Sequence, residues 1–275
     1  SMLAIAANKL EIKTIIFCDD MDAPAQNFAN EFIHGQYDDQ NKINEFIDKV
    51  DVITYEFENI PYETLNKINK FKPVLPKPSV NRIIQHRLAE KDFINKLNIR
   101  TTRYASIQKK SEMDSMQDLL PGLLKTTTLG YDGKGQYLIN SIEDLDSQSI
   151  DFSKDYILEK LVKLKKEISI IITRFNDKEY EIYEPIENTH EDQMLKYSKI
   201  PAKINDKTLN QSKLWAIQIA EELKYIGTLC VEFFIDRNEN LYVNEIAPRV
   251  HNSGHLTINA YNVSQFENHI RAVCK

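Results

Sequence analysis

The chain has 275 residues and a formal net charge of -6, and this length suits two or three modest domains. Its acidic balance, with an isoelectric point near 5.6, argues against nucleic-acid binding, which normally requires a basic surface. No apolar run approaches the roughly 18 residues that cross a bilayer, so a soluble protein without a membrane partner is expected. The widely spaced Cys18, Cys230 and Cys274 fit free thiols in a reducing cytoplasm.

The first part of the chain alternates helical and strand patterns. Helices are expected at residues 3–10 and 40–49, and strands at residues 13–18 and 50–55. Such alternation indicates a parallel sheet of the α/β class. The opening helix is unusual, because a doubly wound domain normally begins with a strand and a phosphate-binding turn. We therefore expect a partial doubly wound domain over residues 1–78, which ends at a proline-rich stretch.

The pattern changes after this boundary, over residues 79–275. A long helix with Ser79 as its N-cap is expected at residues 79–97, and another helix at residues 207–224. Between them the pattern predicts shorter strands at residues 122–127, 136–139, 156–160, 167–174 and 179–185. The second domain is therefore expected to be α+β in part.

Two strands near the C-terminus carry the strongest chemical signal. Residues 228–235 and 241–245 flank a polar turn, which predicts an antiparallel hairpin. Centring the turn on residues 238–239 places Glu232 opposite Glu245 and Asp236 opposite Leu241. Facing carboxylates repel each other, and Mg²⁺ between them would remove the repulsion because hard cations bind carboxylate oxygens. Solvated edge glutamates are the alternative, which the apolar neighbours disfavour.

A glycine-rich segment stands out in a glycine-poor chain. Three of the seven glycines fall within six positions, in the run Gly130, Tyr131, Asp132, Gly133, Lys134, Gly135 and Gln136. Glycine permits close backbone approach, so successive N–H groups can cradle phosphate oxygens. Lys125, on the preceding strand, can add a positive charge to the same phosphates. A plain hairpin turn explains the loop nearly as well, but the nearby carboxylate pair favours a nucleotide site.

A polar segment follows the second carboxylate strand directly. Arg249 can hold a carboxylate or a phosphate through two parallel hydrogen bonds, and His251, Asn252 and Ser253 can bind a polar substrate. The alternative is a polar loop that caps the next helix. His190 is a weaker candidate, since isolated histidines are more often structural.

Together these residues resemble the ATP-grasp superfamily and, within it, the N5-carboxyaminoimidazole ribonucleotide synthetase family. The resemblance rests on Glu232, the run from Asn244 to His255, the glycine loop, and residues 55–61 and 264–267. It covers nearly the whole chain. It implies an ATP-grasp fold over residues 79–275, preceded by the partial doubly wound domain, with a lid subdomain at about residues 104–162.

The resemblance also implies a reaction. ATP would phosphorylate bicarbonate, and the carboxyphosphate, or CO₂ released from it, would carboxylate 5-aminoimidazole ribonucleotide in purine biosynthesis. Mg²⁺ would be the cofactor, and a cytoplasmic homodimer is expected.

Site residues are implied position by position. Glu232 and Glu245 would hold the metal, and Arg249 and His251 would be catalytic. Ribonucleotide contacts would come from Glu56, Arg249, His251, Asn252 and Ser253. Besides the glycine loop, ATP contacts would come from Arg87, Lys125, Glu159, Lys160, Leu161, Val162, Glu167, His190, Asn244 and Glu245.

The chain also departs from the family pattern. The family has a strand and a glycine-rich turn before the first residue of this sequence, and a small basic domain beyond Lys275. Both would contact the ribonucleotide, so weak binding of that substrate is expected. Two alternatives stay open: another ATP-grasp ligase, of the formate-dependent transformylase or biotin carboxylase type, and a catalytically silent nucleotide-binding protein.

Overall fold

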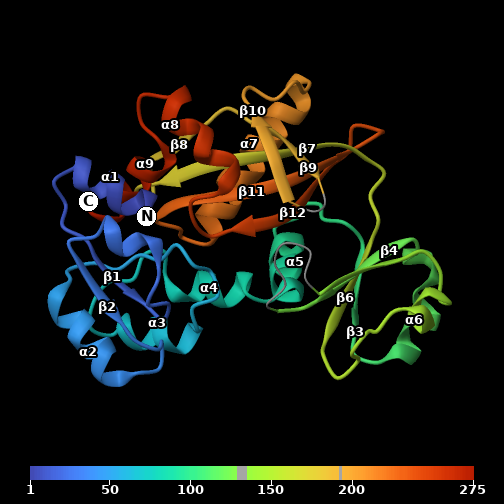
Figure 1. The fold of residues 1–275 in the computed structure, drawn as a ribbon. Coiled ribbons are helices and arrows are strands. Elements are labelled where there is room, and N and C mark those ends of the chain that lie inside the picture. The colour runs from blue at the N-terminus through green and yellow to red at the C-terminus, as the bar shows by residue number, and fades with distance from the viewer. Residues whose placement is uncertain (129–134, 192–193) are drawn as a thin grey trace.

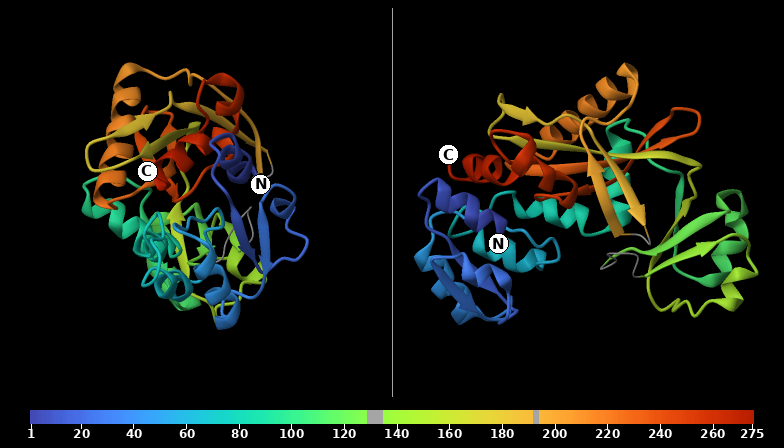
Figure 2. Two further views of the ribbon diagram at one scale, coloured as in Figure 1. Left: turned by 90° about the vertical axis from the view of Figure 1, so that its left-hand side faces the viewer. Right: turned by 45° about the horizontal axis from the view of Figure 1, so that its top comes forward.

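The computed structural model describes residues 1–128, 135–191 and 194–275. Its strands form a two-stranded sheet in an N-terminal part, a four-stranded sheet in a projecting lobe, and a six-stranded sheet in the body (Figure 1). The right-hand view of Figure 2 shows the lobe standing away from the body. Within the described residues, no helix is both long enough and apolar enough to cross a membrane.

The N-terminal part contains the parallel strand pair expected from the sequence. Strands β1 (Ile15–Cys18) and β2 (Glu31–His34) pair in parallel, and the 3₁₀ turn η1 (Pro24–Asn27) lies between them. The opening helix α1 (Met2–Lys9) packs instead against the last helix, α9 (Gln265–Val273). This contact explains why an apolar helix precedes the first strand, and it brings the two ends of the chain together (Figure 1).

Helix α2 (Gln40–Lys49) occupies its expected range and is capped by the Asp39 carboxylate. Its apolar residues lie on one face and pack with helix α3 (Tyr62–Ile68) in the N-terminal core. The prediction of a strand at residues 50–55 is wrong. Within this segment the structure has only an isolated β-bridge, between Ile53 and Val74.

The helix expected at residues 79–97 is broken in two, as α4 (Pro78–Ile84) and α5 (Arg87–Lys96). His86 between them is extended, with φ -124° and ψ 109°. The break is stabilised by contacts to other parts of the chain: the Gln85 side chain donates to the carbonyls of Glu58 and Ile60, and the N–H of Arg87 donates to the Thr127 carbonyl at 2.9 Å. These partners are distant in sequence, so the break could not be predicted from the spacing of apolar residues.

The lobe is an antiparallel sheet in the order β3-β6-β4-β5. The sheet contains β3 (Tyr104–Ile107), β4 (Gly122–Thr126), β5 (Gln136–Ile139) and β6 (Tyr156–Lys160). The 3₁₀ segment η2 (Lys110–Leu119) and the short helix α6 (Asp144–Ser147) supply side chains to its buried core. The lobe therefore has a hydrophobic core of its own.

The body is built on an antiparallel sheet in the order β10-β9-β7-β11-β12, with β8 also paired to β7. Its strands are β7 (Leu164–Arg174), β8 (Tyr180–Ile182), β9 (Ile186–Glu191), β10 (Met194–Lys199), β11 (Gly227–Asp236) and β12 (Leu241–Ala247). Strands β9 and β10 were not anticipated, because their polar sequences lack the apolar alternation that marks a half-buried strand.

The two faces of this sheet are covered by different helices. Helices α4, α5 and α7 (Asp206–Glu222) pack on the side that carries Leu229, Val231 and Phe233. Glu232 alternates to the opposite side, as strand geometry requires. There the last helix, α9, packs on β7 and β11, and the 3₁₀ segment η3 (Asn252–Leu256), which leads into α8 (Thr257–Ala260), packs on β9 and β10.

A buried histidine joins the body to the N-terminal part. The His269 ring accepts a hydrogen bond from the N–H of Thr228 at Nδ1, 3.0 Å away, and its Nε2 lies 2.7 Å from the Thr54 hydroxyl. Since Nδ1 is an acceptor, the ring proton sits on Nε2 and is donated to Thr54. Burial lowers the pKa of His269 from 6.5 to about 4, so the imidazole is neutral in the folded protein.

We predict that replacing His269 with asparagine flattens part of the pH dependence of stability. The pKa of His269 is lower when folded, so its contribution is complete above about pH 6.5 and is lost as the pH falls toward 4. The difference in unfolding free energy between wild type and His269→Asn should shrink over that window, by up to about 1.4 kcal/mol per pH unit. Urea titrations at several pH values measure it. The exposed His34→Asn variant serves as control, and parallel profiles for wild type and His269→Asn would contradict the prediction.

Candidate active site

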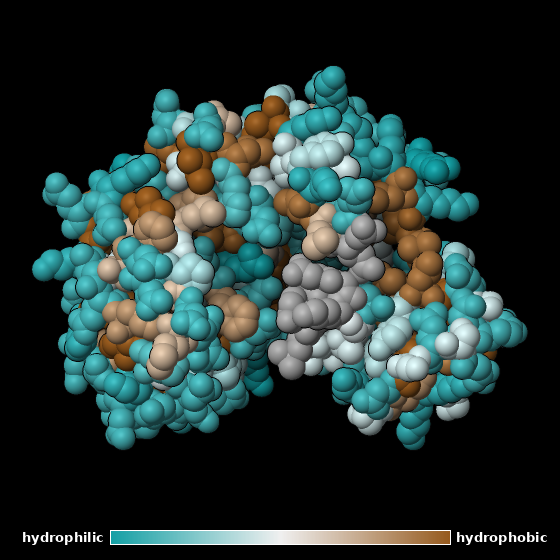
Figure 3. All heavy atoms as spheres, viewed as in Figure 1, coloured by the Kyte–Doolittle hydropathy of each residue, from teal (hydrophilic) through white to brown (hydrophobic). Residues whose placement is uncertain are grey.

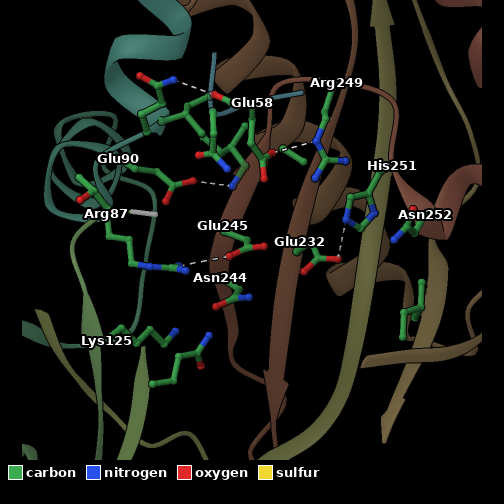
Figure 4. A pocket seen from close by; sticks show the side chains of 18 of the residues that line it. Glu58, Arg87, Glu90, Lys125, Glu232, Asn244, Glu245, Arg249, His251 and Asn252 are labelled. Carbon is green, nitrogen blue, oxygen red and sulfur yellow. Dashed lines mark hydrogen bonds and ion pairs between the residues drawn. The ribbon is translucent and has the colours of Figure 1, made fainter. Parts of the chain in front are cut away.

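A cavity of about 500 Å³ lies where the body, the lobe and the N-terminal part approach one another. The space-filling view shows the hollow between the lobe and the rest of the molecule (Figure 3), and the close-up shows polar side chains projecting into it from several elements (Figure 4). The residues that line it and carry polar or charged groups include Glu58, Asn59, Gln85, Arg87, Glu90, Lys125, Gln136, Glu167, His190, Glu232, Asn244, Glu245, Arg249, His251 and Asn252.

Glu232 and Glu245 face each other across the β11–β12 hairpin, as the sequence predicted. Both side chains line the cavity, with exposed fractions of 13% and 40% respectively. Figure 4 shows them at the centre of the polar group.

The register that produces this pairing differs from the expected one. Leu241 pairs with Ile235 instead of Asp236, because the Asp236 carboxylate accepts hydrogen bonds from N–H groups of the turn and lengthens it. A bulge at Asn244 then shifts the register by one residue and brings the two glutamates opposite each other. Asn244 and Glu245, although adjacent, both line the cavity.

The two carboxylates have opposite electrostatic environments. Burial, and then the charge of Glu245, raise the pKa of Glu232 to about 8. Burial also opposes ionisation of Glu245, but Arg87 and Lys125 outweigh it and hold its pKa below the usual value. Arg87 Nη1 lies 3.5 Å from Glu245 Oε2. A pair in which one carboxylate suppresses ionisation of the other is a donor set that fits a hard divalent cation.

A buried charge cluster lies beside the cavity and connects the lobe to the body. The Glu159 carboxylate on β6 contacts two ammonium groups, those of Lys91 on α5 and Lys125 on β4, each at 3.3 Å. It also accepts a hydrogen bond from the Thr102 hydroxyl at 3.2 Å. Lys91 donates in addition to the Asn244 carbonyl at 3.1 Å. Despite burial, the nearby cations lower the pKa of Glu159 to about 2, so it stays ionised.

Helix α5 presents three cavity-side groups at helical spacing. Glu90 and Lys91 follow Arg87 by three and four residues, so both lie on the face of the helix that carries Arg87. Glu90 Oε1 accepts a hydrogen bond from the N–H of Ile246 at 2.6 Å. Burial, followed by the charge of Glu245, raises the pKa of Glu90 to about 8, which leaves it protonated at neutral pH.

The segment after β12 forms the other wall of the cavity. Arg249 Nε donates to the Glu58 carboxylate at 2.9 Å, which joins the body to the N-terminal part. His251 Nε2 lies 3.5 Å from Glu232 Oε1, and its Nδ1 lies 2.8 Å from the Ser253 hydroxyl (Figure 4). Burial, with Arg249 nearby, lowers the pKa of His251 to about 4, so the ring is neutral.

Glu167 on β7 and His190 on β9 lie together at the edge of the cavity. The Glu167 carboxylate contacts His190 Nδ1, and this hydrogen bond raises the pKa of the imidazole. The structure thus pairs two residues that the resemblance assigned separately to the nucleotide.

Some expected site residues lie elsewhere. Glu56 is exposed in the N-terminal part and is near the Ser1 amino group, whereas its neighbour Glu58 lines the cavity. The side chains of Glu159, Lys160, Leu161 and Val162 do not line it, and Lys160 donates to carbonyls inside the lobe. Ser253 is buried behind His251. Gly130, Tyr131, Asp132, Gly133 and Lys134 lie outside the described residues; Gly135, with φ +71°, packs against Thr126, and Gln136 lines the cavity.

Comparison with known proteins gives a consistent result over the whole chain. Residues 92–266 match the ATP-grasp domain model, and residues 1–85 match the ribonucleotide synthetase preATP-grasp domain model. The N5-carboxyaminoimidazole ribonucleotide synthase of Staphylococcus aureus strain COL is 38% identical, over 99% of this chain and 73% of that protein. This chain is therefore a member of the N5-carboxyaminoimidazole ribonucleotide synthase family.

Solved structures of this family agree with the assignment. The Staphylococcus aureus N5-carboxyaminoimidazole synthetase complexed with ADP has a TM-score of 0.94 at 38% identity, covering 99% of this chain and 73% of that one. The N5-carboxyaminoimidazole ribonucleotide synthetase from Thermus thermophilus has a TM-score of 0.92 at 32% identity, covering 99% and 75%. The resemblance read from the motifs and the expected ATP-grasp fold are thereby confirmed.

Several cavity or near-cavity residues were missed at the level of sequence, among them Glu58, Gln85, Glu90 and Lys91. Residues 55–61 contain both Glu56 and Glu58, and the local sequence does not show which of the two carboxylates points into the cavity. Glu90 and Lys91 could have been found from their helical spacing to Arg87. Gln85 could not, because its role depends on the unexpected break between α4 and α5.

We predict that Glu159→Gln destabilises the protein more than Lys91→Met. The first change leaves two buried ammonium groups without a carboxylate, which should cost about 3–5 kcal/mol. The second leaves Glu159 paired with Lys125 at 3.3 Å, so its cost should be smaller. Chemical denaturation of both variants measures the difference. Asp118→Asn, which removes an exposed ion pair with Arg103, should cost no more than about 1 kcal/mol. An equal or smaller loss for Glu159→Gln than for Lys91→Met would contradict this account.

Proposed function

We propose that this chain uses ATP to carboxylate 5-aminoimidazole ribonucleotide with bicarbonate, giving N5-carboxyaminoimidazole ribonucleotide, ADP and phosphate in purine biosynthesis. The observation that carries the proposal is the Glu232–Glu245 pair, set against Arg87 and Lys125 in a single cavity of a family member. ADP is named as the ligand of the related Staphylococcus aureus structure. The activity would be that of a carbon–nitrogen ligase.

The carboxylate pair would hold Mg²⁺, with Asn244 beside it. When bound, the cation would neutralise charge on the transferred phosphoryl group. Arg87 and Lys125 approach the same carboxylate from α5 and β4, so they are placed to bind phosphate oxygens. The glycine loop of residues 130–136 would close on those phosphates through its backbone N–H groups.

The nucleoside end of ATP would lie along the lobe–body junction. Glu167 would bind ribose hydroxyls, and His190, which contacts Glu167, would lie near the nucleotide. Because the Glu159 side chain is committed to Lys91 and Lys125, residues 159–162 would contact adenine mainly through their backbone.

The opposite wall would bind the ribonucleotide and the carboxylating intermediate. Arg249, oriented by Glu58, would steady the carboxyphosphate. The neutral His251 holds its proton on Nε2, toward Glu232, since its Nδ1 accepts the N–H of Ser253 at 3.3 Å. His251 and Asn252 would then bind the ribonucleotide, with Glu56 at the outer edge, and the buried Ser253 would act through the His251 ring that it contacts.

We further propose an organisation for the chain as a whole. Residues 1–78 would form the preATP-grasp domain and residues 79–275 the ATP-grasp domain, with residues 104–162 as its lid. A cytoplasmic location and a homodimer are part of the same proposal.

The proposed function predicts ADP release that depends on both bicarbonate and 5-aminoimidazole ribonucleotide. Coupled assay of ADP, with product identified by mass spectrometry, measures it. Formate with glycinamide ribonucleotide, or biotin, should give no stimulation, since the Arg249–Asn252 wall is proposed to bind aminoimidazole ribonucleotide. Stimulation by one of these alternative substrates would replace the proposed reaction with another ATP-grasp ligation, and ATP binding without any turnover would indicate a silent nucleotide-binding protein.

A separate prediction concerns the carboxylate pair. Glu232→Gln and Glu245→Gln should each weaken calorimetric Mg·ATP binding by at least about tenfold, because one charge-assisted ligand is worth roughly 1.5–3 kcal/mol. Stability without metal should be nearly unchanged for Glu232→Gln at neutral pH, since the pKa of Glu232 is raised to about 8 and glutamine resembles the protonated carboxyl in shape. Glu239→Gln, at the tip of the same hairpin and paired with Lys165, is the matched control. Unchanged Mg·ATP affinity in both cavity variants would refute the metal assignment.

A further inference from the structure

Cys230 places a thiol beside the carboxylate pair, and the proposed reaction does not use it. It lies two residues before Glu232 on β11 and therefore projects from the same face of the strand. The ligand atoms of Cys230, Glu232 and His251 all lie within 4.8 Å of one another. Cys230 is fully buried, whereas Glu232 and His251 line the cavity, so the thiol lies behind the two cavity residues.

The histidine of this group is held in an orientation suited to a metal ligand. Its Nδ1 accepts the N–H of Ser253 at 3.3 Å and lies 2.8 Å from the Ser253 hydroxyl. The His251 backbone is fixed by Gln265, which accepts its N–H at 3.0 Å and donates to its carbonyl at 2.7 Å. Nε2 is therefore the nitrogen directed toward Glu232, 3.5 Å from its carboxylate. To bind a cation at Nε2, the ring would carry its proton on Nδ1 and donate it to the Ser253 hydroxyl, 2.8 Å away, in place of the longer contact from the Ser253 N–H. Metal-bound histidines are oriented by such donation from their second nitrogen.

The carboxylate and the thiol also have polar neighbours. Ser169 donates to Glu232 Oε1 at 3.4 Å and accepts in turn from Asn188 at 2.6 Å. Cys230 Sγ lies 4.0 Å from the Ser253 hydroxyl. Ser253 thus contacts two members of the group, which limits their relative movement.

We propose that Cys230, Glu232 and His251 form a binding site for a borderline-soft divalent cation such as Zn²⁺. Sulfur, imidazole nitrogen and carboxylate oxygen are the ligand types of tetrahedral zinc sites, with metal–ligand distances of about 2.0–2.3 Å. A contraction of about 1 Å from the present separations would meet those distances. Binding would release to solvent the thiol proton and the proton that the Glu232 carboxyl holds at neutral pH, and the fourth position would face the cavity.

This site would distinguish zinc-like cations from magnesium. Mg²⁺ takes oxygen ligands and would gain nothing from the thiol, whereas Zn²⁺ binds thiolate and imidazole strongly. Because both sites share Glu232, Zn²⁺ would exclude productive Mg·ATP and inhibit the enzyme. That inhibitory consequence rests on the proposed function, but binding of the cation itself does not.

Metal titrations of the whole chain without nucleotide test the site directly. Zn²⁺ binding is followed by calorimetry, and Co²⁺ by the thiolate-to-cobalt charge-transfer band in its absorption spectrum. Cys230→Ser should abolish that band and weaken Zn²⁺ binding at least about tenfold, since loss of even an outer-shell partner costs 10- to 100-fold. The matched control, Cys18→Ser/Cys274→Ser, retains Cys230 as its only thiol and should keep both the band and the affinity.

The outcomes separate clearly. Unchanged Zn²⁺ affinity in Cys230→Ser, loss of binding in the Cys18/Cys274 double variant, or absence of a cobalt band in that double variant would each overturn the site. If Cys230→Ser does not fold, the band in the double variant decides alone. Mg²⁺-dependent turnover of Cys230→Ser should equal that of wild type while its inhibition by Zn²⁺ is relieved. A chain without turnover that still binds Zn²⁺ through Cys230 would refute the proposed function and leave the metal site standing.

Discussion

The structure depends on two carboxylates, Glu232 and Glu245, that face each other in the cavity. Like charges in that position cannot both ionise without a compensating cation. The chain supplies compensation for Glu245 from two separate elements, Arg87 on α5 and Lys125 on β4 of the lobe. It supplies less for Glu232, whose pKa is raised to about 8. The remaining deficit of positive charge at Glu232 supports the proposal that the cavity binds a divalent cation.

The lobe is tied to this pair through buried charges as well as through the chain. Glu159 and Lys125 belong to the lobe, whereas Lys91 belongs to α5 and also contacts the Asn244 carbonyl of the hairpin. A buried ion pair adds little net stability, but separating its members is costly because each is left desolvated and alone. The cluster therefore resists displacement of the lobe strands from the hairpin. The cluster therefore fixes the position of the lobe relative to the hairpin more than it raises the free energy of unfolding.

Local patterns in the sequence were sufficient for some elements and for the central chemistry. Helix α2 follows from periodicity and its cap, which involve only nearby residues. The Glu232–Glu245 pairing was predicted from a turn that proved one residue longer, and the bulge at Asn244 compensates for this difference. The break at His86 and the buried Lys91–Glu159 contact depend on partners far along the chain. Strand β10 is an edge of the sheet and β9 is its neighbour, and both carry many polar side chains, so their sequences lack the strand signal. Long-range contacts, rather than weak local preferences, account for what could not be predicted.

The bulge at Asn244 connects these features. In a regular strand Asn244 and Glu245 would point to opposite faces, yet both line the cavity. Strand β12 is also the edge of its sheet, so its outer backbone groups need partners from elsewhere. They find them in the Arg100 carbonyl, which accepts the N–H of Val243, and in the side chains of Lys91 and Glu90. Helix α5 therefore supplies partners to the sheet edge and also directs Arg87 at Glu245. The irregular strand that carries Glu245 is held by the same helix that neutralises the Glu245 charge.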